Sequence, residues 1–258
     1  MENNSCLLSI ILPAYNEGSR IDASLKAVMA KMSSLNIPYE LIVVDDGSTD
    51  DTFQRARPFA GEHVHVLTYD QNRGKGYAIR HGMLKAQGAY KLFMDVDLAT
   101  SLEAVEEFLQ IMREKPVDII IGNRKNNPSL QEVKQPLYRQ FFGEGFTRLS
   151  CLVVGCEFSD FTCGFKMYTR RAADIIFPRQ RTFDWAFDTE LVAIAVQHNL
   201  KIYESPVQWH HCQGSKVRVT RDITRSLISL GKIGFNSIRG LYKRAAAVEA
   251  LKPSHESA

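Results

Sequence analysis

The chain has 258 residues, of which 45% are hydrophobic and 24% charged, and this size and composition predict one globular domain with at most a small extension. A net charge of +3 is too small to indicate a nucleic-acid-binding protein. The five cysteines are an odd number without a Cys-x-x-Cys pair, which favours reduced thiols in the cytosol over a zinc site or a disulfide framework. We see no signal-peptide pattern and no apolar stretch near the ~20 residues that span a bilayer.

The first half of the chain alternates strand-like apolar runs with helix-like amphipathic segments. Ser48 and Asp51 form a candidate capping box for the second of the expected helices. Strands that are apolar on both faces and alternate with helices predict a doubly wound, mostly parallel α/β sheet with helices on both faces. In chain order we expect a strand at 8–12, a helix at 20–35, a strand at 41–44, a short helix at 52–60, a strand at 64–67, a helix at 77–86, a strand at 90–94, a helix at 102–112 and a strand at 118–121.

The second half of the chain is less regular. Its patterns predict helices at 136–154, 187–198 and 223–242, and short strands at 165–168 and 201–203. No repeat, low-complexity tract or linker divides the chain. We therefore expect one domain of residues 1–220, followed by a basic, amphipathic helical extension of residues 221–258.

Acidic residues follow three of the predicted strands. Glu17 comes after the first strand, Asp46 after the second, and Asp95 and Asp97 after the fourth. Doubly wound sheets bind their ligands at the carboxyl ends of the strands. The sequence therefore predicts that these three clusters form a single site.

Asp95 and Asp97 end an apolar run abruptly. Residues two apart on a strand point to the same side, so the two carboxylates are expected to lie together. Two neighbouring carboxylates repel each other unless a positive charge lies between them. A hard cation such as Mg²⁺ or Mn²⁺, holding a substrate diphosphate, meets that need.

Seven segments of the chain form a recognisable series: LPAYNE at 12–17, VVDDGSTD at 43–50, NRGKG at 72–76, DVD at 95–97, TCGFKMY at 162–168, WAFDTEL at 185–191 and GSKV at 214–217. In this order they resemble the inverting nucleotide-sugar glycosyltransferases of family 2 and, within it, the dolichyl-phosphate glucosyltransferases and mannosyltransferases. The resemblance covers roughly residues 8–220 and implies a GT-A fold, a nucleotide-sugar donor, either UDP-glucose or GDP-mannose, and a divalent metal.

The residues expected to bind the nucleotide are Pro13, Tyr15, Glu17, Asp46, Lys75 and Asp95. Pro13, Tyr15 and Glu17 match positions that shape the nucleoside pocket, and a carboxylate at Glu17 suits a pair of ribose hydroxyls. Asp46 matches the acid that reads the base edge, and it accepts equally well from uracil or guanine. Lys75, between two glycines that precede a predicted helix, is either a diphosphate ligand or a surface lysine.

By the same resemblance, Asp97 is the main metal ligand, and Asp95 contacts the nucleotide or binds the metal through water. Ala99 is a departure from the pattern, because many phosphomannose synthases carry a glutamine metal ligand at this position. The small residue at this position favours the glucosyl branch, and the resemblance does not identify a residue that replaces the glutamine as a metal ligand.

The acceptor decides the rest of the chemistry. A polyprenyl monophosphate has its second ionisation near pH ~6 and needs cations rather than a strong base. Arg124 and the Ser215-Lys216 pair match phosphate-binding elements of the lipid-phosphate enzymes, and Arg139 is a weaker candidate. A sugar hydroxyl would instead need a carboxylate base, for which Asp188, Asp184 and Glu190 are available. The expected catalytic set is Asp97, Arg124, Lys216 and Asp188.

The predicted helix at 223–242 carries apolar residues on one side and basic residues on the other. Residues 216–244 contain eight basic residues and one acid, Asp222. This pattern fits an interfacial helix on anionic lipid, or else a helix packed on the core with a solvated basic face. We expect a cytoplasmic protein that associates peripherally with the cytosolic face of a membrane, through lipid or a membrane-protein partner.

Three other functions stay open to different degrees. The first is a family 2 glycosyltransferase that acts on a sugar hydroxyl in polysaccharide or glycolipid synthesis. The second, more distant, is a non-catalytic nucleotide-binding module. A phosphohydrolase of the haloacid-dehalogenase type is disfavoured, because its motif has threonine where this chain has Ala99 and normally lies on an early strand.

Overall fold

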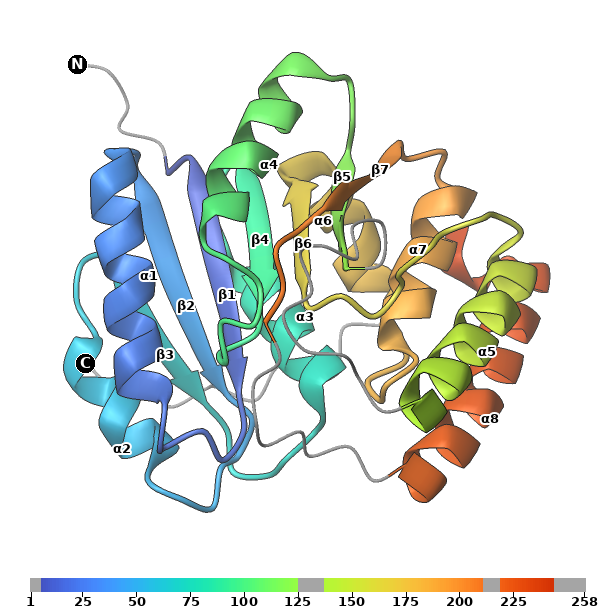
Figure 1. Ribbon diagram of the computed structural model, residues 1–258, viewed down its shortest axis with the longest axis horizontal. Helices are drawn as coiled ribbons and strands as arrows, with labels where there is room; N and C mark the ends of the chain where they lie inside the picture. The colour runs from blue at the N-terminus through green and yellow to red at the C-terminus, as the bar shows by residue number, and fades with distance from the viewer. Residues whose placement is uncertain (1–5, 125–136, 211–218, 244–258) are drawn as a thin grey trace.

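The computed structural model describes residues 6–124, 137–210 and 219–243 (Figure 1). Seven strands form one sheet in the order β3-β2-β1-β4-β6-β5-β7. All strands are parallel except β6, which runs antiparallel between β4 and β5. The prediction of a mostly parallel α/β sheet is therefore confirmed. The strands are β1 (Leu8–Ala14), β2 (Tyr39–Asp45), β3 (Val64–Thr68), β4 (Tyr90–Met94), β5 (Ile119–Asn123), β6 (Phe165–Thr169) and β7 (Ile202–Pro206).

Helices cover both faces of the sheet, as predicted, with α1 and α4 on one face and α3, α6 and α7 on the other (Figure 1). Beyond them, α5 and α8 pack against each other and against α7. The helices are α1 (Ile21–Leu35), α2 (Thr52–Ala56), α3 (Lys75–Lys85), α4 (Glu103–Glu114), α5 (Leu137–Val154), α6 (Arg170–Ile176), α7 (Phe187–Gln197) and α8 (Val219–Ile238), with short 3-10 turns at Arg57–Phe59, Phe177–Arg179 and Leu241–Lys243.

Strand alternation divides the core into two layers. In β1, Ile11 packs into the layer under α3 and α7, whereas Ile10 and Leu12 pack into the layer under α1 and α4. Both layers are made mainly of buried aliphatic and aromatic side chains, although the central strands β4 and β6 also bury Lys91 and Lys166.

Three details of the local predictions were wrong, the first being the helix expected at 223–242, which spans Val219–Ile238 and is followed by a separate 3-10 turn. The helix expected at 52–60 ends at Ala56, and a separate 3-10 turn, Arg57–Phe59, follows it with Pro58 at its centre. No side chain caps α2 at Asp51, and Ser48 instead accepts a hydrogen bond from the backbone N–H of Asn16 at 2.9 Å.

The strand register brings distant loops to one edge of the sheet. Ala14 pairs with Asp45 and Asp45 with Thr68, so the loops after β1, β2 and β3 begin at the same level. Because β6 is antiparallel, its first residue, Phe165, pairs with Met94 at the end of β4. The segments that carry the predicted site residues therefore converge at this edge.

Candidate active site

The loops after β1 and β2 are joined by direct hydrogen bonds. The side-chain oxygen of Asn16 accepts from the backbone N–H of Thr49 at 2.8 Å, and Glu17 donates its backbone N–H to Thr52 at 2.7 Å. The Glu17 carboxylate forms an ion pair with Arg20 at 2.9 Å. Tyr15 is exposed beside this loop. These hydrogen bonds fix the loop that carries Tyr15 and Glu17 next to Asp46.

Asp46 directly follows β2, and its side chain binds the loop that follows β3. Its carboxylate is 2% exposed and accepts four hydrogen bonds, from Tyr69 Oη at 2.6 Å, Asn72 Nδ2 at 2.9 Å, and the backbone N–H groups of Arg73 at 2.8 Å and Gly74 at 3.0 Å. Burial raises the pKa of Asp46, and the hydrogen bonds act against this shift. Asp46 therefore shapes the route of the chain into α3, a role that the sequence did not reveal.

Lys75 is the first residue of α3, and its side chain lies near three aspartates, Asp95, Asp97 and Asp188. Its Nζ is 2.5 Å from Oδ1 of Asp95. Burial opposes the ammonium charge, but Asp95, Asp188 and Asp97 outweigh burial and raise the pKa of Lys75. Sequence reasoning left open whether Lys75 is a surface residue. The structure places it at the predicted site.

Asp95 and Asp97 lie close together, but not for the predicted reason. β4 ends at Met94, so both aspartates lie on a turn, in which Leu98 adopts a left-handed φ of 52°. Asp97 accepts the backbone N–H of Ala99 at 3.0 Å. Burial, and after it the charge of Asp95, raise the pKa of Asp97.

The two aspartates fit a hard divalent cation by their chemistry. Both offer carboxylate oxygens, the donors that Mg²⁺ and Mn²⁺ prefer. The described residues contain no group of three or more His, Cys, Asp or Glu side chains arranged to hold a metal. Mg²⁺ usually takes one or two carboxylates and completes its shell with substrate phosphates and water, and a two-aspartate site suits this pattern.

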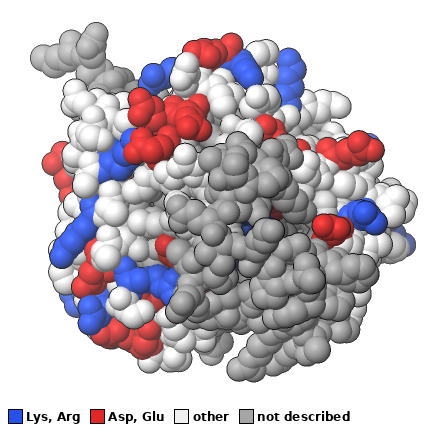
Figure 2. All heavy atoms as spheres, in the orientation of Figure 1, with Lys and Arg blue, Asp and Glu red and all other residues white. Residues whose placement is uncertain are grey.

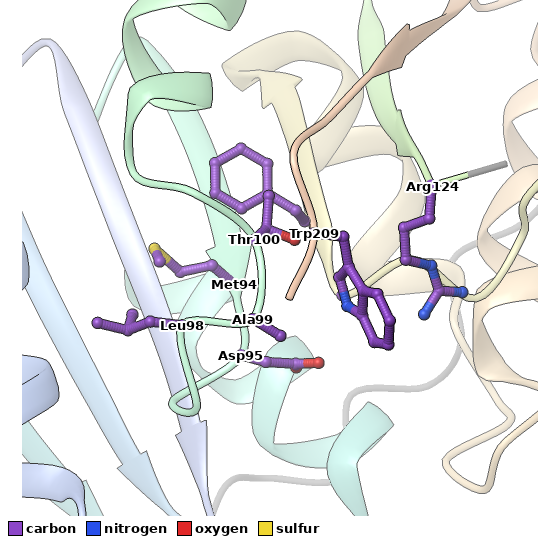
Figure 3. A pocket seen from close by; sticks show the side chains of 9 residues that line it. Met94, Asp95, Leu98, Ala99, Thr100, Arg124 and Trp209 are labelled. Carbon is purple, nitrogen blue, oxygen red and sulfur yellow. The ribbon is translucent and has the colours of Figure 1, made fainter. Parts of the chain in front are cut away.

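A small pocket lies beside Asp95, with Asp95 and Ala99 on one side and Trp209 and Arg124 on the other (Figure 3). Trp209 reaches the pocket because it bridges to Thr100 just beyond β7. Sequence reasoning missed Trp209, although its place after the carboxyl end of a parallel strand was a usable signal. The remaining lining residues are Met94, Leu98, Thr100, Gly164 and Phe165.

Arg124 is held in the pocket by a buried acid. Its Nε and Nη2 atoms bind the two oxygens of Asp160 at 2.7 and 2.8 Å, and Nη2 also donates to Thr162 at 2.9 Å. Burial opposes the charge of the guanidinium, but Asp160 outweighs burial and raises the pKa of Arg124. No sequence pattern marked Asp160 as this partner, because the contact spans 36 residues.

The acids that a sugar-hydroxyl acceptor would need are all engaged. Asp188 forms a buried ion pair with Lys166 at 2.5 Å, and Asp184 accepts from Ser229 Oγ at 2.6 Å. Glu190 is 0% exposed and accepts the hydroxyl of Tyr242 at 2.8 Å. Burial raises the pKa values of Asp188 and Glu190, which are otherwise lowered by these partners.

Several predicted residues cannot be placed in this arrangement. Ser215 and Lys216 lie outside the described residues. Arg139 belongs to α5, but only its backbone is described. Pro13 lies in β1 and is half-buried at the level of Val44. The structure therefore brings together Glu17, Asp46, Lys75, Asp95, Asp97, Arg124 and Asp188 at one edge of the sheet.

His81 is a buried titratable residue beneath this edge. It stacks on Tyr77 with ring centroids 6.2 Å apart, and neither ring nitrogen has a hydrogen-bond partner within the described part of the chain. Burial, followed by the charges of Lys85, Arg80 and Arg73, lowers the pKa of His81 below 6.5. The folded protein therefore resists taking up a proton that the unfolded chain accepts.

This difference gives a pH prediction. Below pH 6.5 the unfolded state binds the proton first, so the free energy of unfolding falls as the pH falls toward the lower pKa of His81. We expect His81→Phe to remove a slope of at most about 1.4 kcal/mol per pH unit in this range. Urea unfolding of both proteins from pH 7.5 to 5 measures it, and the difference between them cancels the contributions of the buried acids. Parallel curves would contradict the prediction.

A wound α/β sheet with paired aspartates, a lysine at a helix N-terminus and an arginine at the same edge defines a glycosyltransferase of the GT-A type. The model of Glycosyl transferase family 2 matches residues 9–177, and the chain belongs to this family.

Similar proteins agree with this assignment. The dolichyl-phosphate beta-glucosyltransferase of Saccharomyces cerevisiae is 30% identical over 262 residues, which cover 94% of this chain and 78% of that protein. The human protein of the same name is 33% identical, over 81% of this chain and 69% of its own length.

Solved structures extend the agreement to the fold. Mannosyl-3-phosphoglycerate synthase from Rubrobacter xylanophilus aligns with a TM-score of 0.68 at 17% identity, over 96% of this chain and 79% of its own. Glucosyl-3-phosphoglycerate synthase from Mycobacterium tuberculosis, solved with UDP, aligns with a TM-score of 0.62 at 19% identity, over 89% and 80%. These matches confirm the predicted GT-A fold. Within the described ranges, no helix has the length and apolarity needed to cross a membrane.

Proposed function

We propose that this protein is an inverting, metal-dependent glucosyltransferase that moves glucose from UDP-glucose to dolichyl phosphate or a related polyprenyl monophosphate. The relatives named dolichyl-phosphate beta-glucosyltransferase support this acceptor, and Ala99 favours the glucosyl branch. One structural observation carries the proposal. Each acid that would serve a sugar-hydroxyl acceptor, Asp184, Asp188 or Glu190, already has internal partners. A phosphate monoester is nucleophilic near neutral pH without such a base.

The donor half of the reaction uses the acidic edge. Asp95 and Asp97 would hold Mg²⁺ or Mn²⁺, which when bound neutralises charge on the departing diphosphate. Lys75 adds a fixed positive charge there, at a helix N-terminus that itself favours phosphate. Glu17, Tyr15 and Pro13 form the nucleoside side of the site, and Asp46 sets the loop beside it.

The acceptor half uses the cations across the pocket. Asp160 fixes the plane of the Arg124 guanidinium, and a guanidinium held in this way binds a phosphate with defined orientation. Arg139, Ser215 and Lys216 complete the proposed acceptor set. Attack of a phosphate oxygen on the anomeric carbon breaks the bond to UDP and inverts the configuration, so an α-linked donor gives a β-linked lipid product.

The donor and acceptor can be tested together. UDP-glucose, GDP-mannose and other nucleotide sugars are incubated with polyprenyl phosphate or with soluble sugars, and the products are identified by mass. We expect a glucosyl-phosphoryl lipid from UDP-glucose. Glucose transfer to a soluble sugar hydroxyl, with none to the lipid phosphate, would favour the polysaccharide alternative instead.

Arg124→Ala tests the acceptor site. We expect kcat/KM for the lipid phosphate to fall roughly tenfold to hundredfold, because a charge-assisted phosphate contact is lost. The affinity for UDP should change little, since Arg124 lies across the pocket from Asp95. The variant leaves Asp160 buried without its ion pair, so Arg124→Ala/Asp160→Asn is the matched control for stability. Equal losses of UDP affinity and acceptor use in calorimetry and kinetics would reassign Arg124 to the donor.

A lipid acceptor requires contact with a membrane, and we propose that α5 and α8 form it. Steps of about 100° per residue divide α8 into three stripes. One stripe is buried, including Leu230 and Ile233. The second stripe is apolar and exposed, and Ile238 at its end is 89% exposed. Arg225 and Lys232, with Arg239 directly after the helix, form the third, basic stripe. The exposed apolar residues are Leu227, Ile228, Phe235 and Ile238 on α8 and Leu149 and Leu152 on α5.

This surface suits anionic lipid because apolar and basic stripes lie side by side. Figure 2 shows acidic and basic side chains interspersed over the described part of one face. On this view residues 1–220 form the catalytic domain and residues 221–258 an extension that seats it on the cytosolic face of a membrane.

Substituting Ile228, Phe235 and Ile238 together by glutamine tests the membrane surface. Each loses about 1.5 kcal/mol or more of apolar burial in lipid, so the partition coefficient onto anionic vesicles should fall at least roughly a hundredfold. The three side chains are exposed, so the melting temperature should stay unchanged. Flotation with vesicles measures binding, and UDP affinity serves as the control for an intact site. Unchanged flotation would exclude this surface.

A further inference from the structure

Glu190 is buried on α7, away from the pocket, and its carboxylate has three protein partners. Oε2 accepts the backbone N–H groups of Arg181 at 2.8 Å and Thr182 at 2.6 Å, and Oε1 accepts the hydroxyl of Tyr242 at 2.8 Å. Glu190 is fully buried and does not line the pocket, so its carboxylate does not face a substrate there. It does fix the course of residues 180–184, here called the 180–184 loop.

The 180–184 loop rests directly on the start of α3. Phe183 accepts the backbone N–H of Gly76 at 3.2 Å, and the Gln180 side chain donates to the carbonyl of Gly76 at 3.1 Å. A Cβ on Gly74 would lie 2.8 Å from the Phe183 carbonyl, so only glycine allows this approach. Gly74 also has a φ of 97°, which disfavours other residues. Lys75 lies between the two glycines and is therefore held from both sides.

The same loop is tied to the helix that we propose for the membrane. Ser229 of α8 donates to Asp184 at 2.6 Å, and Tyr242 belongs to the turn that follows α8. Tyr242 is itself held, because its carbonyl lies 2.9 Å from Nε2 of His198. A continuous set of contacts thus runs from α8 through Glu190 and the loop to Lys75.

We propose that Glu190 is a positioning residue for the donor site, which fixes Lys75 by holding the 180–184 loop against Gly74 and Gly76. The inference rests on the proposed function, in which Lys75 meets the diphosphate of the donor. It predicts that the shape and hydrogen-bonding capacity of residue 190 matter, and that its charge does not.

Two substitutions of Glu190 separate geometry from charge. In Glu190→Gln the amide oxygen can accept both backbone N–H groups while the amide nitrogen donates to Tyr242, so UDP affinity and kcat should stay within about threefold of wild type. Glu190→Leu keeps the size but leaves both N–H groups unpaired. We expect it to weaken UDP binding, measured by calorimetry with Mg²⁺, at least tenfold. If Glu190 were a catalytic base, Glu190→Gln would abolish turnover and leave UDP affinity intact, which would overturn the proposal.

Tyr242→Phe provides an independent test that removes a single hydroxyl. It should weaken UDP binding about twofold to fivefold, and it should add nothing in a Glu190→Leu background, because both changes act through one bond. Tyr203→Phe on β7 is the matched control and should have no effect. If Glu190→Leu does not fold, Tyr242→Phe and Glu190→Gln still decide the matter, since unchanged UDP affinity in Tyr242→Phe contradicts the inference.

The outcomes also separate this inference from the proposed function. If the wild-type protein does not bind UDP, the proposed function fails. If the wild-type protein binds UDP and folded Glu190→Leu binds it equally well, then the positioning role fails and the glucosyltransferase assignment stands. A lower melting temperature with unchanged UDP affinity would mark Glu190 as structural alone and would likewise overturn the proposal.

Discussion

Replacing Asp97 by asparagine is expected to lower kcat/KM for glucose transfer at least roughly a thousandfold and to leave the fold intact. The loss arises because a carboxylate that would hold the metal at the leaving diphosphate becomes a neutral, weaker ligand. The turn should persist, since the asparagine oxygen can still accept the backbone N–H of Ala99. Burial already disfavours the charge of Asp97, so its neutralisation should not lower the melting temperature.

Steady-state kinetics and thermal unfolding together check this result. Glu106→Gln is the matched control, because it makes the same carboxylate-to-amide change on the exposed surface of α4. Chelation of divalent metals should abolish wild-type turnover, and Mg²⁺ or Mn²⁺ should restore it. Near-normal turnover by Asp97→Asn, or by the wild type after exhaustive chelation, would remove the metal from the mechanism and favour a different role for these acids.

The sheet was predictable because the strands are short, continuous apolar runs between amphipathic helices. Every expected strand is present, within two residues at each end except for β7, which runs three residues beyond its expected end. Helix α6 was missed, because Arg170–Ile176 is a single amphipathic stretch of seven residues that follows β6 without a break. The direction of β6 was equally out of reach, since pairing partners far apart in the chain leave no local pattern.

The site was predictable as a set of residues and less so as a geometry. Asp95 and Asp97 were chosen from their spacing on a strand, yet a turn brings them together. The sequence marked Asp46 but not Tyr69 and Asn72, whose side chains bind its carboxylate. Such contacts depend on how loops from three strands meet, and this is set by the register of the sheet rather than by any local preference.

Three pairs of opposite charges lie at the proposed site. Lys75 pairs with Asp95, Arg124 with Asp160, and Lys166 with Asp188. Of these pairs, Lys166 with Asp188 is buried on both sides, whereas the Lys75 and Asp95 side chains are 30% and 37% exposed. Ion pairs contribute little to stability, because screening or desolvation offsets their attraction. On the proposed function, the pairs of Lys75 and Arg124 would instead hold positive charge in place for a diphosphate and an acceptor phosphate before the substrates arrive.

Gly164→Ala should reduce kcat/KM at least roughly a hundredfold, although the added group is a single methyl. An ideal Cβ at Gly164 would lie 2.1 Å from Oδ2 of Asp95, so the carboxylate must leave its place beside Lys75. A misplacement of about 1 Å in an active site can cost a hundredfold in rate. Gly164 does not have a positive φ, so backbone strain is not the cause. Gly145→Ala, on exposed α5 with nothing within 4 Å, is the matched control.

A double-mutant cycle with Asp95→Ala tests whether space for this carboxylate is what Gly164 provides. With the carboxylate removed, the methyl at residue 164 has room, so Gly164→Ala should change kcat/KM by less than about threefold in that background. Steady-state kinetics of the four proteins, each checked by thermal unfolding, measure the coupling. Full additivity would mean that Gly164→Ala acts on something other than Asp95, such as the neighbouring strand pairing, and the close approach of these two residues would then have no part in catalysis.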